Sequence, residues 1–276
     1  PGVRGSEPAA AATEIFLRAR AFQPGELLVV AVTLGADASA VNVRVFDRTT
    51  TASRIGPGRW EALVGIDLDQ APGPYAVTAV AEGGMRAVKD VTVAPRTFPV
   101  RRLTVSPDFV NPPKAVQARI AEESRFLQEV YAGSAPERLW AGPWERPVPH
   151  RANSRFGSRS VFNGEARNPH SGADFLSPSG TPIHAPNAGR VVVARDTYFN
   201  GNLVIVDHGA GVFSQLAHLS RIDVREGEDV TPGQVVGLVG ATGRVTGAHL
   251  HWGLRVGDAR VDPLSVLALF PPPEAR

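Results

Sequence analysis

The sequence contains no cysteine, which excludes a disulfide framework, a thiol nucleophile and any zinc site built on thiolates. It contains only two lysines among 29 basic residues. Basic and acidic residues nearly balance, 29 against 27, so neither a basic footprint nor a nucleic-acid partner is expected. No apolar run reaches the roughly 18–20 residues needed to cross a bilayer. A metal in this chain would therefore depend on carboxylates and on its seven histidines.

The length and composition are those of a globular chain of one large or two ordinary domains. The chain has 276 residues, of which 43% are apolar and 20% charged, enough apolar residues for a substantial core. Residues 1–13 form a small-residue stretch, PGVRGSEPAAAAT, which predicts a flexible lead-in. This stretch has no apolar segment of the kind found in signal peptides, so no signal peptide is expected within this chain.

Residues 14–106 show the alternation typical of β-strands. Apolar and polar residues alternate with period 2 in short runs that are separated by turn-forming glycines and prolines. About 90 residues with seven such runs predict an immunoglobulin-like β-sandwich. The runs are EIFLRARAF, LLVVAVTL, VNVRVFDRT, RWEALVGIDL, YAVTAVAEG, AVKDVTVAP and VRRLTV.

Residues 107–142 predict a connecting helix followed by a linker. Asn111 is a candidate N-cap, the two prolines after it suit a first turn, and Gly133 follows the last periodic residue. Apolar residues recur at helical spacing on one stripe, which we expect to pack against a neighbouring domain rather than a membrane. The stripe consists of Val116, Ile120, Leu127, Val130 and Tyr131.

Residues 143–276 predict a second, mainly antiparallel β domain. Short apolar runs such as GRVVVARD, NLVIVDHG and HLHWGLRV are separated by glycines, with no helical pattern of any length. All seven histidines lie in this part of the chain. The expected fold class is therefore mainly β, with any chemistry in the C-terminal domain.

Two histidine motifs in this domain have spacings that suit a metal. His170 and Asp174 form an H-x3-D motif in a loop that enters an apolar strand. His249 and His251 form an H-x-H motif, whose two imidazoles project from the same face if the segment is a strand. His218 ends a run that is a plausible neighbouring strand. Together these residues supply four imidazoles and one carboxylate to a single pocket.

This mixture of side chains suits catalytic zinc. Such a site usually takes three protein ligands from histidine and carboxylate and leaves a fourth position for water. The ion lowers the pKa of that water to about 7 and polarises a carbonyl group under attack. Further histidines nearby suit proton transfer and hydrogen bonding to the developing oxyanion.

The surrounding sequence resembles the zinc endopeptidases of the lysostaphin/LytM type, peptidase family M23. The resemblance extends over about 110 residues, in order, and leaves the N-terminal 140 residues outside the core of the family. The segments that carry it are FGSR at 156–159, HSGADF at 170–175, TPIHAPNAGRVV at 181–192, GNLVIVDHG at 201–209, LAHLS at 216–220, VREGEDVTPGQVVGLVGATGRVTGAHLHWGL at 224–254 and VDPL at 261–264.

The resemblance implies a role for each of the five residues. It makes His170, Asp174 and His251 the ligands of one zinc ion per chain, and His218 and His249 the catalytic pair beside it. It implies hydrolysis of peptide cross-links in bacterial peptidoglycan by metal-bound water, in an extracytoplasmic compartment: periplasm, cell envelope or outside the cell. Which of the two catalytic histidines is the base stays open.

Two alternatives to this interpretation and one regulatory hypothesis that is compatible with it remain. A degenerate, non-catalytic envelope protein that binds cell wall or regulates other hydrolases would typically have lost zinc ligands, and none is missing here. A lipoyl- or biotinyl-type carrier requires a lysine at a hairpin tip, but the C-terminal domain has none. Finally, the apolar stripe and the short proline-rich connector suggest that the N-terminal region narrows or covers the groove of the peptidase domain.

Overall fold

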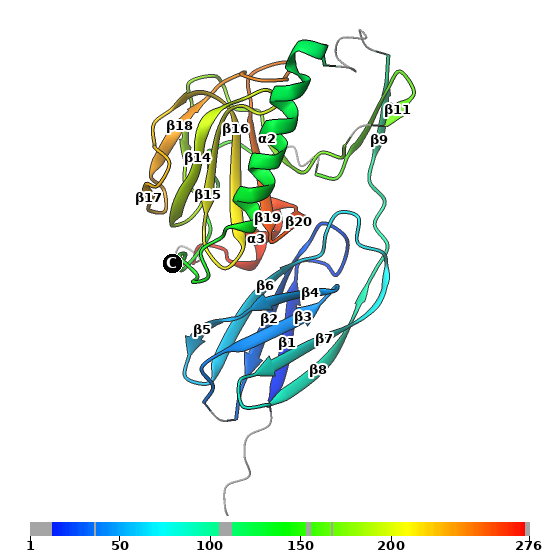
Figure 1. Ribbon diagram of the computed structural model, residues 1–276, viewed down its shortest axis with the longest axis vertical. Helices are drawn as coiled ribbons and strands as arrows, with labels where there is room; N and C mark the ends of the chain where they lie inside the picture. Colours follow the sequence, from blue (N-terminus) through cyan, green and yellow to red (C-terminus); the bar gives the residue numbers. More distant parts are fainter. Residues whose placement is uncertain (1–12, 36, 105–111, 153–155, 167, 274–276) are drawn as a thin grey trace, which may run out of the picture.

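The fold consists of two small N-terminal antiparallel sheets, a long helix and a larger C-terminal antiparallel sheet (Figure 1). The computed structural model describes residues 13–35, 37–104, 112–152, 156–166 and 168–273. Nearly all of the predicted lead-in, and the candidate N-cap Asn111, lie outside the described residues. Within the described part, no helix is long and apolar enough to cross a membrane.

The first eight strands form two four-stranded sheets that share one apolar core. All pairings within both sheets are antiparallel. One sheet has the order β1 (Glu14–Ala19), β2 (Leu27–Thr33), β6 (Arg59–Gly65), β5 (Ser53–Gly56). The other has the order β4 (Arg48–Thr51), β3 (Val41–Val45), β7 (Gly73–Ala81), β8 (Arg86–Val93). Alternate residues of strands such as β3 point into the shared core, as the period-2 pattern predicts.

The last of the seven expected strands lies elsewhere. The VRRLTV run forms β9 (Val100–Leu103), which pairs in parallel with β10 (Arg159–Phe162) in a separate three-stranded sheet completed by β11 (Glu165–Ala166). Conversely, β4 and β5 follow β3 in short polar runs that lack the expected alternation of apolar residues. The prediction of a seven-strand set was therefore wrong at these three strands. It misplaced β9 because parallel pairing across more than 50 residues leaves no local pattern, and it missed β4 and β5 because these strands lack the alternation.

The predicted helix is present as α2 (Lys114–Ala132). Pro113 occupies the N-cap position, and Gly133 ends the helix with its N–H donating to the Val130 carbonyl. As expected, part of the apolar stripe packs against the C-terminal domain: Leu127, Val130 and Tyr131 contact a buried cluster on strands of its large sheet, and Phe126, which was not assigned to the stripe, joins them.

The C-terminal domain is built on a nine-stranded antiparallel sheet, as predicted from its short glycine-punctuated runs. Its main path is β12 (Gly172–Phe175), β19 (Leu250–Val256), β16 (Val212–Ile222), β15 (Gly201–Asp207), β14 (Gly189–Thr197), β17 (Asp229–Val230). Pairing off this path are β13 (Pro182–His184), β18 (Val235–Val239) and β20 (Ala259–Val261). A short helix that the sequence analysis did not anticipate, α3 (Pro263–Leu269), follows β20.

One face of the large sheet forms the domain core, and the other face carries α2. Leu216 and Leu219 of β16 and Trp252 of β19 point into the main core, whereas Phe213 and Ala217 of β16 face the apolar stripe of α2. In Figure 1, α2 runs alongside β16 across this second face. The second face is the one that also carries the histidine motifs.

The N-terminal sheets dock against the hairpin of β19 and β20. Leu27, Val29 and Leu63 belong to the core of the C-terminal domain, whereas the residues that alternate with them belong to the N-terminal core. A Cβ atom on Gly65 would overlap the side chain of Ala259, so the close approach requires glycine. Arg260 donates to both oxygens of Asp67 across this interface.

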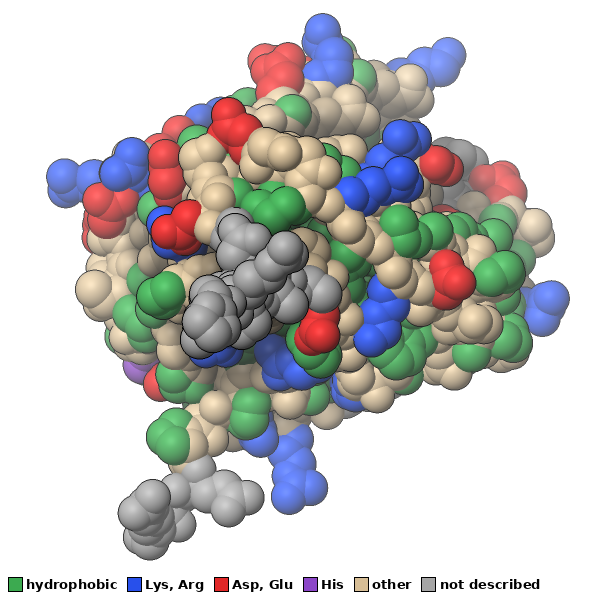
Figure 2. Space-filling view, turned by 90° about the horizontal axis from the view of Figure 1, so that it is seen from below, with side chains coloured by type: hydrophobic (Ala, Val, Ile, Leu, Met, Phe, Trp, Pro, Cys, Tyr) green, Lys and Arg blue, Asp and Glu red, His purple; other side chains and the backbone are tan. Residues whose placement is uncertain are grey.

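The molecular face seen along the long axis shows no segregation of charge. In Figure 2, basic and acidic side chains are interspersed over this face. Elsewhere on the chain, exposed charges of opposite sign pair with each other, as Arg190 and Asp229 do on the C-terminal sheet. This mixed surface is what the near-balance of 29 basic and 27 acidic residues predicts.

Candidate metal centre

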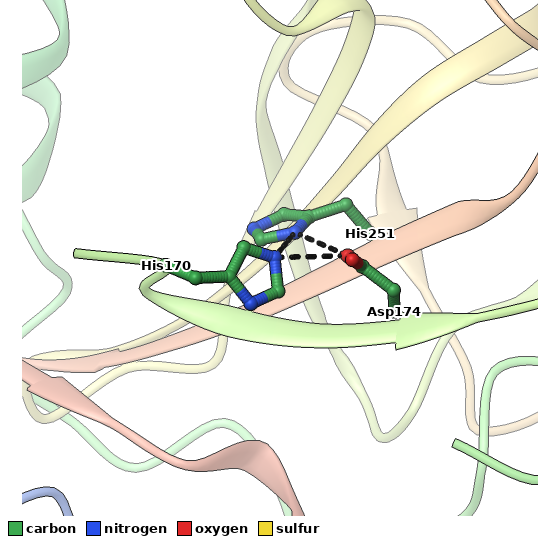
Figure 3. Close-up of side chains that lie close together, drawn as sticks. All are labelled: His170, Asp174 and His251. Atoms are coloured by element: carbon green, nitrogen blue, oxygen red, sulfur yellow. Dashed lines mark hydrogen bonds and ion pairs between the residues drawn. The ribbon is translucent and has the colours of Figure 1, made fainter. Parts of the chain in front are cut away.

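Three side chains from both histidine motifs meet on neighbouring strands. His170 lies two residues before the start of β12, Asp174 lies in β12, and His251 lies directly opposite Asp174 in β19. Asp174 Oδ1 is 2.9 Å from His170 Nε2 and 3.0 Å from His251 Nδ1, and the two ring nitrogens are 3.0 Å apart. Figure 3 shows the three side chains turned toward one another above the paired strands.

The donor set fits a zinc ion. Three ligand atoms placed tetrahedrally around zinc, with bonds of about 2.0–2.1 Å, lie about 3.3 Å from one another. The observed triangle, with sides of 2.9–3.0 Å, is close to that size before any metal-induced adjustment. Two imidazoles and a carboxylate form a ligand set typical of catalytic zinc, with one further position left for water or substrate.

A glycine inside the H-x3-D motif makes room for this arrangement. A Cβ atom on Gly172 would lie 2.7 Å from Nε2 of His251 and 2.5 Å from the Trp252 carbonyl oxygen. Any larger residue would displace the imidazole or separate β12 from β19. The glycine of the motif is therefore required by the close packing of the second histidine.

The electrostatics of the cluster keep the carboxylate ionised and one ring neutral. Burial would raise the pKa of Asp174, but hydrogen bonds from His170 and His251 and the charges of these rings outweigh it and hold the pKa well below its usual value. Burial also lowers the pKa of His251, against the opposing effect of Asp174. The cluster thus presents an anionic oxygen and a neutral imidazole, which are the forms that bind a divalent cation.

His218 and His249 lie beside the three-residue cluster. Their ring centroids are 4.9 Å apart, and His249 Nε2 is 3.8 Å from Asp174 Oδ1. His218 Nδ1 donates to the Thr242 carbonyl at 3.0 Å, and His249 Nδ1 donates to the Gly247 carbonyl at 2.9 Å. With Nδ1 committed to a carbonyl, Nε2 of each neutral ring is left as the proton acceptor.

A β-bulge turns His218 toward the cluster. Leu216 pairs with Val204 and Leu219 with Asn202, so β16 has one residue more than β15 in this interval. His218 has a φ of 69°, in the left-handed region that β-strand residues avoid. Regular alternation would place its side chain in the core; the bulge redirects it to the face of His251, a use of bulges that is common near active sites.

The environment of His218 favours the neutral ring. Burial lowers its pKa to about 4, with further contributions from the neighbouring His251 and His249. A neutral imidazole near pH 7 is able to accept a proton, which is the state a general base requires.

The three remaining histidines have hydrogen-bonding partners away from the cluster. His208 is fully buried, its ring nitrogens 2.7 Å from the Ala188 carbonyl oxygen and 2.9 Å from Ser214 Oγ. Burial lowers its pKa to about 4. His184 bonds to the Gly233 carbonyl and His150 to Ser177. These contacts give all three histidines packing and turn roles outside the cluster.

Sequence reasoning missed a group of polar residues next to the cluster. Gln215 faces the histidine side of β16, opposite Gly253 and two residues before the partner of His251. Its amide donates to Asn200 Oδ1 at 3.0 Å and its carbonyl oxygen accepts from the Tyr131 hydroxyl at 2.8 Å. Burial raises the pKa of Tyr131 to about 12, so this hydroxyl stays protonated. No motif marks these residues, because their contacts join distant segments.

The fold and the site together define a class, that of metallopeptidases with an antiparallel sheet and a His-Asp-His centre. The profile of Peptidase family M23 matches residues 168–263, which include all five of the residues described above. The crystal structure of a protein assigned to peptidase M23 from Pseudomonas aeruginosa is similar over 87% of this chain and 92% of that one. Its TM-score is 0.68 and its sequence identity 35%. The chain belongs to peptidase family M23.

Curated relatives match part of the chain. The chain is 43% identical over 115 residues to the peptidoglycan DD-endopeptidase ShyA of Vibrio cholerae, a match that covers 41% of this chain and 27% of ShyA. It is 41% identical over 105 residues to the DD-carboxypeptidase/endopeptidase Mpg of Neisseria meningitidis, covering 38% of this chain and 24% of Mpg. The matches thus span only about a quarter of the length of these relatives.

Proposed function

We propose that this chain is a zinc metalloendopeptidase that hydrolyses peptide cross-links of bacterial peptidoglycan, outside the cytoplasm. The observation that carries the proposal is the triangle of His170 Nε2, Asp174 Oδ1 and His251 Nδ1, with sides of 2.9–3.0 Å. These three residues would hold one zinc ion per chain. The substrate and the compartment are inferred from the peptidoglycan endopeptidases among the relatives.

The residues of the chain would divide the work between binding the ion and moving protons. When bound, zinc polarises the scissile carbonyl as a Lewis acid and lowers the pKa of water, so that water is easily deprotonated for attack near neutral pH. His218 and His249 hold Nε2 as a free acceptor while Nδ1 stays bonded to a backbone carbonyl. One would take a proton at Nε2 from the attacking water, and the other, protonated, would donate from Nε2 to the developing oxyanion or the leaving amine.

We also propose that the N-terminal sheets form an immunoglobulin-like domain of residues 14–106. Support comes from the strand orders, β1-β2-β6-β5 and β4-β3-β7-β8, which correspond to the A-B-E-D and C′-C-F-G sheets of that fold. The helix and linker would span residues 107–142 and the peptidase domain 143–276. The sheets themselves contact the hairpin of β19 and β20, so any narrowing of the groove would come from α2, which lies on the histidine face.

Metal analysis combined with digestion of purified muropeptides tests the proposed function. The wild type is expected to bind one zinc per chain and to cleave cross-linked muropeptides. His251→Ala should lose both the zinc and the cleavage, whereas His249→Ala should keep most of the zinc and lose cleavage. Retention of zinc by His251→Ala would refute the ligand assignment. A zinc-loaded wild type that digests nothing would favour a non-catalytic envelope protein.

A further inference from the structure

Helix α2 shares a sheet face with the candidate active site, although it lies outside the residues matched by the family profile. In β16, Phe213 and Ala217 contact its apolar stripe, and Ala217 is the direct partner of His251. Gln215 lies between them in sequence and points to the same side. The helix therefore packs along the row of residues that leads to the metal ligands.

Two hydrogen bonds connect α2 to polar groups beside the histidines. The Tyr131 hydroxyl donates to Gln215 Oε1 at 2.8 Å, at the C-terminal end of the helix. Two turns earlier, Glu123 Oε2 accepts from the backbone N–H of Tyr198 at 2.9 Å. Tyr198 belongs to the turn that joins β14 to β15. The helix is therefore hydrogen-bonded both to Gln215 of β16 and to this turn.

Both connections converge on Asn200 and, through it, on His218. Asn200 lies in the same turn as Tyr198 and accepts from the Gln215 amide on its side-chain oxygen. Its backbone carbonyl accepts the N–H of His218 at 2.8 Å, which the bulge leaves without a partner in the β-ladder. His218 has a φ of 69°, and a strained conformation of this kind persists only where surrounding contacts over-determine it.

We propose that α2 is a positioning element of the active site, which fixes His218 through Glu123, Tyr131 and their common neighbour Asn200. The catalytic consequence rests on the function proposed above, whereas the structural consequence does not. A positioning role and a covering role predict opposite changes in peptidase activity. If α2 covered the site, weakening its contacts would raise activity; if α2 positions His218, weakening them lowers activity.

Paired substitutions on α2 test the proposal. Tyr131→Phe removes only the hydroxyl, and Glu123→Ala removes the acceptor for Tyr198. Glu123→Gln keeps an acceptor oxygen and serves as the rescue variant. Glu122→Ala, at an exposed position of the same helix, removes the same charge and serves as the matched control. For each protein, zinc per chain, kcat and KM on muropeptides, and amide hydrogen exchange of residues 198–201 and 218 would be measured.

We expect Glu123→Ala and Tyr131→Phe to lower kcat by about three- to thirtyfold with a smaller change in KM, because misplacement of a reacting group by a fraction of an ångström has effects of this order. Zinc content should stay at one per chain, and the amides of residues 198–201 and 218 should exchange faster. Glu123→Gln and Glu122→Ala should behave as wild type in every measurement.

The outcomes separate this proposal from the proposed function. Higher activity in Glu123→Ala and Tyr131→Phe would overturn positioning in favour of a cover. Unchanged exchange at residues 198–201 and 218 in both variants would overturn it regardless of activity. An inactive wild type would refute the proposed function, and the exchange measurements would then still decide whether α2 fixes His218.

Discussion

Two carboxylates of similar burial, Asp67 at the domain interface and Asp174 in the metal centre, have different partners. Their side chains are 12% and 19% exposed, and the pKa of each lies below its usual value. Asp67 accepts from a guanidinium, which stays charged at all accessible pH values. Asp174 accepts from imidazoles, which are able to lose their protons.

The role of a buried carboxylate in this protein therefore depends more on its hydrogen-bonding partners than on its burial. The charges of Asp67 and Arg260 compensate each other, and the pair links the N-terminal sheets to the hairpin of β19 and β20. Around Asp174, the carboxylate oxygen and two imidazole nitrogens lie within 3.0 Å of one another and form a ligand set that suits a divalent cation. Isosteric substitution of each aspartate should therefore show which of them is needed for metal binding.

The largest effect is expected from Asp174→Asn. The amide keeps the shape but removes the charge, so zinc binding should weaken severely. Peptidase activity should fall at least about 10³-fold, since metal polarisation contributes several kcal/mol to catalysis. Hydrogen bonds from His170 and His251 favour the ionised carboxylate in the fold, so the metal-free variant should also unfold at a lower urea concentration. Muropeptide digestion, zinc analysis and urea denaturation check these three statements; full zinc occupancy in the variant would contradict the role assigned to Asp174.

Asp67→Asn should lower stability and leave the metal centre intact. It leaves Arg260 with a weaker partner at a largely buried interface, which we expect to cost about 1–3 kcal/mol of unfolding free energy. Zinc content and activity of the folded protein should equal those of the wild type. Urea denaturation combined with metal analysis measures both, and loss of zinc in this variant would show that the interface and the metal centre are coupled.

The stability of the wild type and that of Asp67→Asn should also respond differently to acid. Burial would raise the pKa of Asp67, but hydrogen bonds from Arg260 lower it to about 2. Because the folded-state pKa is below the unfolded value of about 3.9, the carboxylate stabilises the fold above about pH 4, and this contribution is lost as the pH falls toward 2. The unfolding free energy of the wild type should therefore decrease by about 1–2 kcal/mol more than that of Asp67→Asn over this interval. Equal losses of unfolding free energy in the wild type and in Asp67→Asn over this pH interval would contradict the prediction.

The smallest effect is expected where both partners are exposed. Asp229 pairs with Arg190 on the surface, with side chains 69% and 57% exposed. Pairs of this kind contribute little because solvent screens the charges. Asp229→Asn should leave the urea midpoint, the zinc content and the activity unchanged within error. A clear shift of the midpoint would mean that burial is a poor guide to the value of ion pairs in this protein.

Local patterns in the sequence predicted the metal centre better than its surroundings. The H-x3-D and H-x-H motifs predicted that His170, Asp174, His249 and His251 share one pocket, and the family resemblance implied that His170, Asp174 and His251 are the ligands; the structure brings these three together. The two-sided burial of β2 was not predicted, because LLVVAVTL was grouped with the alternating runs, although LLVVAV is continuously apolar and is buried on both faces.

What the sequence did not predict depends on register and on distant pairing. Regular alternation would turn His218 into the core, and only the bulge, whose residue count is set by β15, turns it outward. The partners of Tyr131 and Glu123 lie about 75–85 residues along the chain, and no local pattern encodes such contacts. The same reason explains the misplacement of β9, which pairs with a strand more than 50 residues away.

The long separation between the segments that meet at the site has a consequence for the order of folding. Asp174 and His251 are 77 residues apart and Tyr131 and Gln215 are 84 residues apart, so both contacts close long loops at a similar entropic cost. The metal centre and the support of His218 are thus expected to form late and together, after the local hairpins of the sheet. A refolding chain would regain its capacity for zinc and its activity in the same phase.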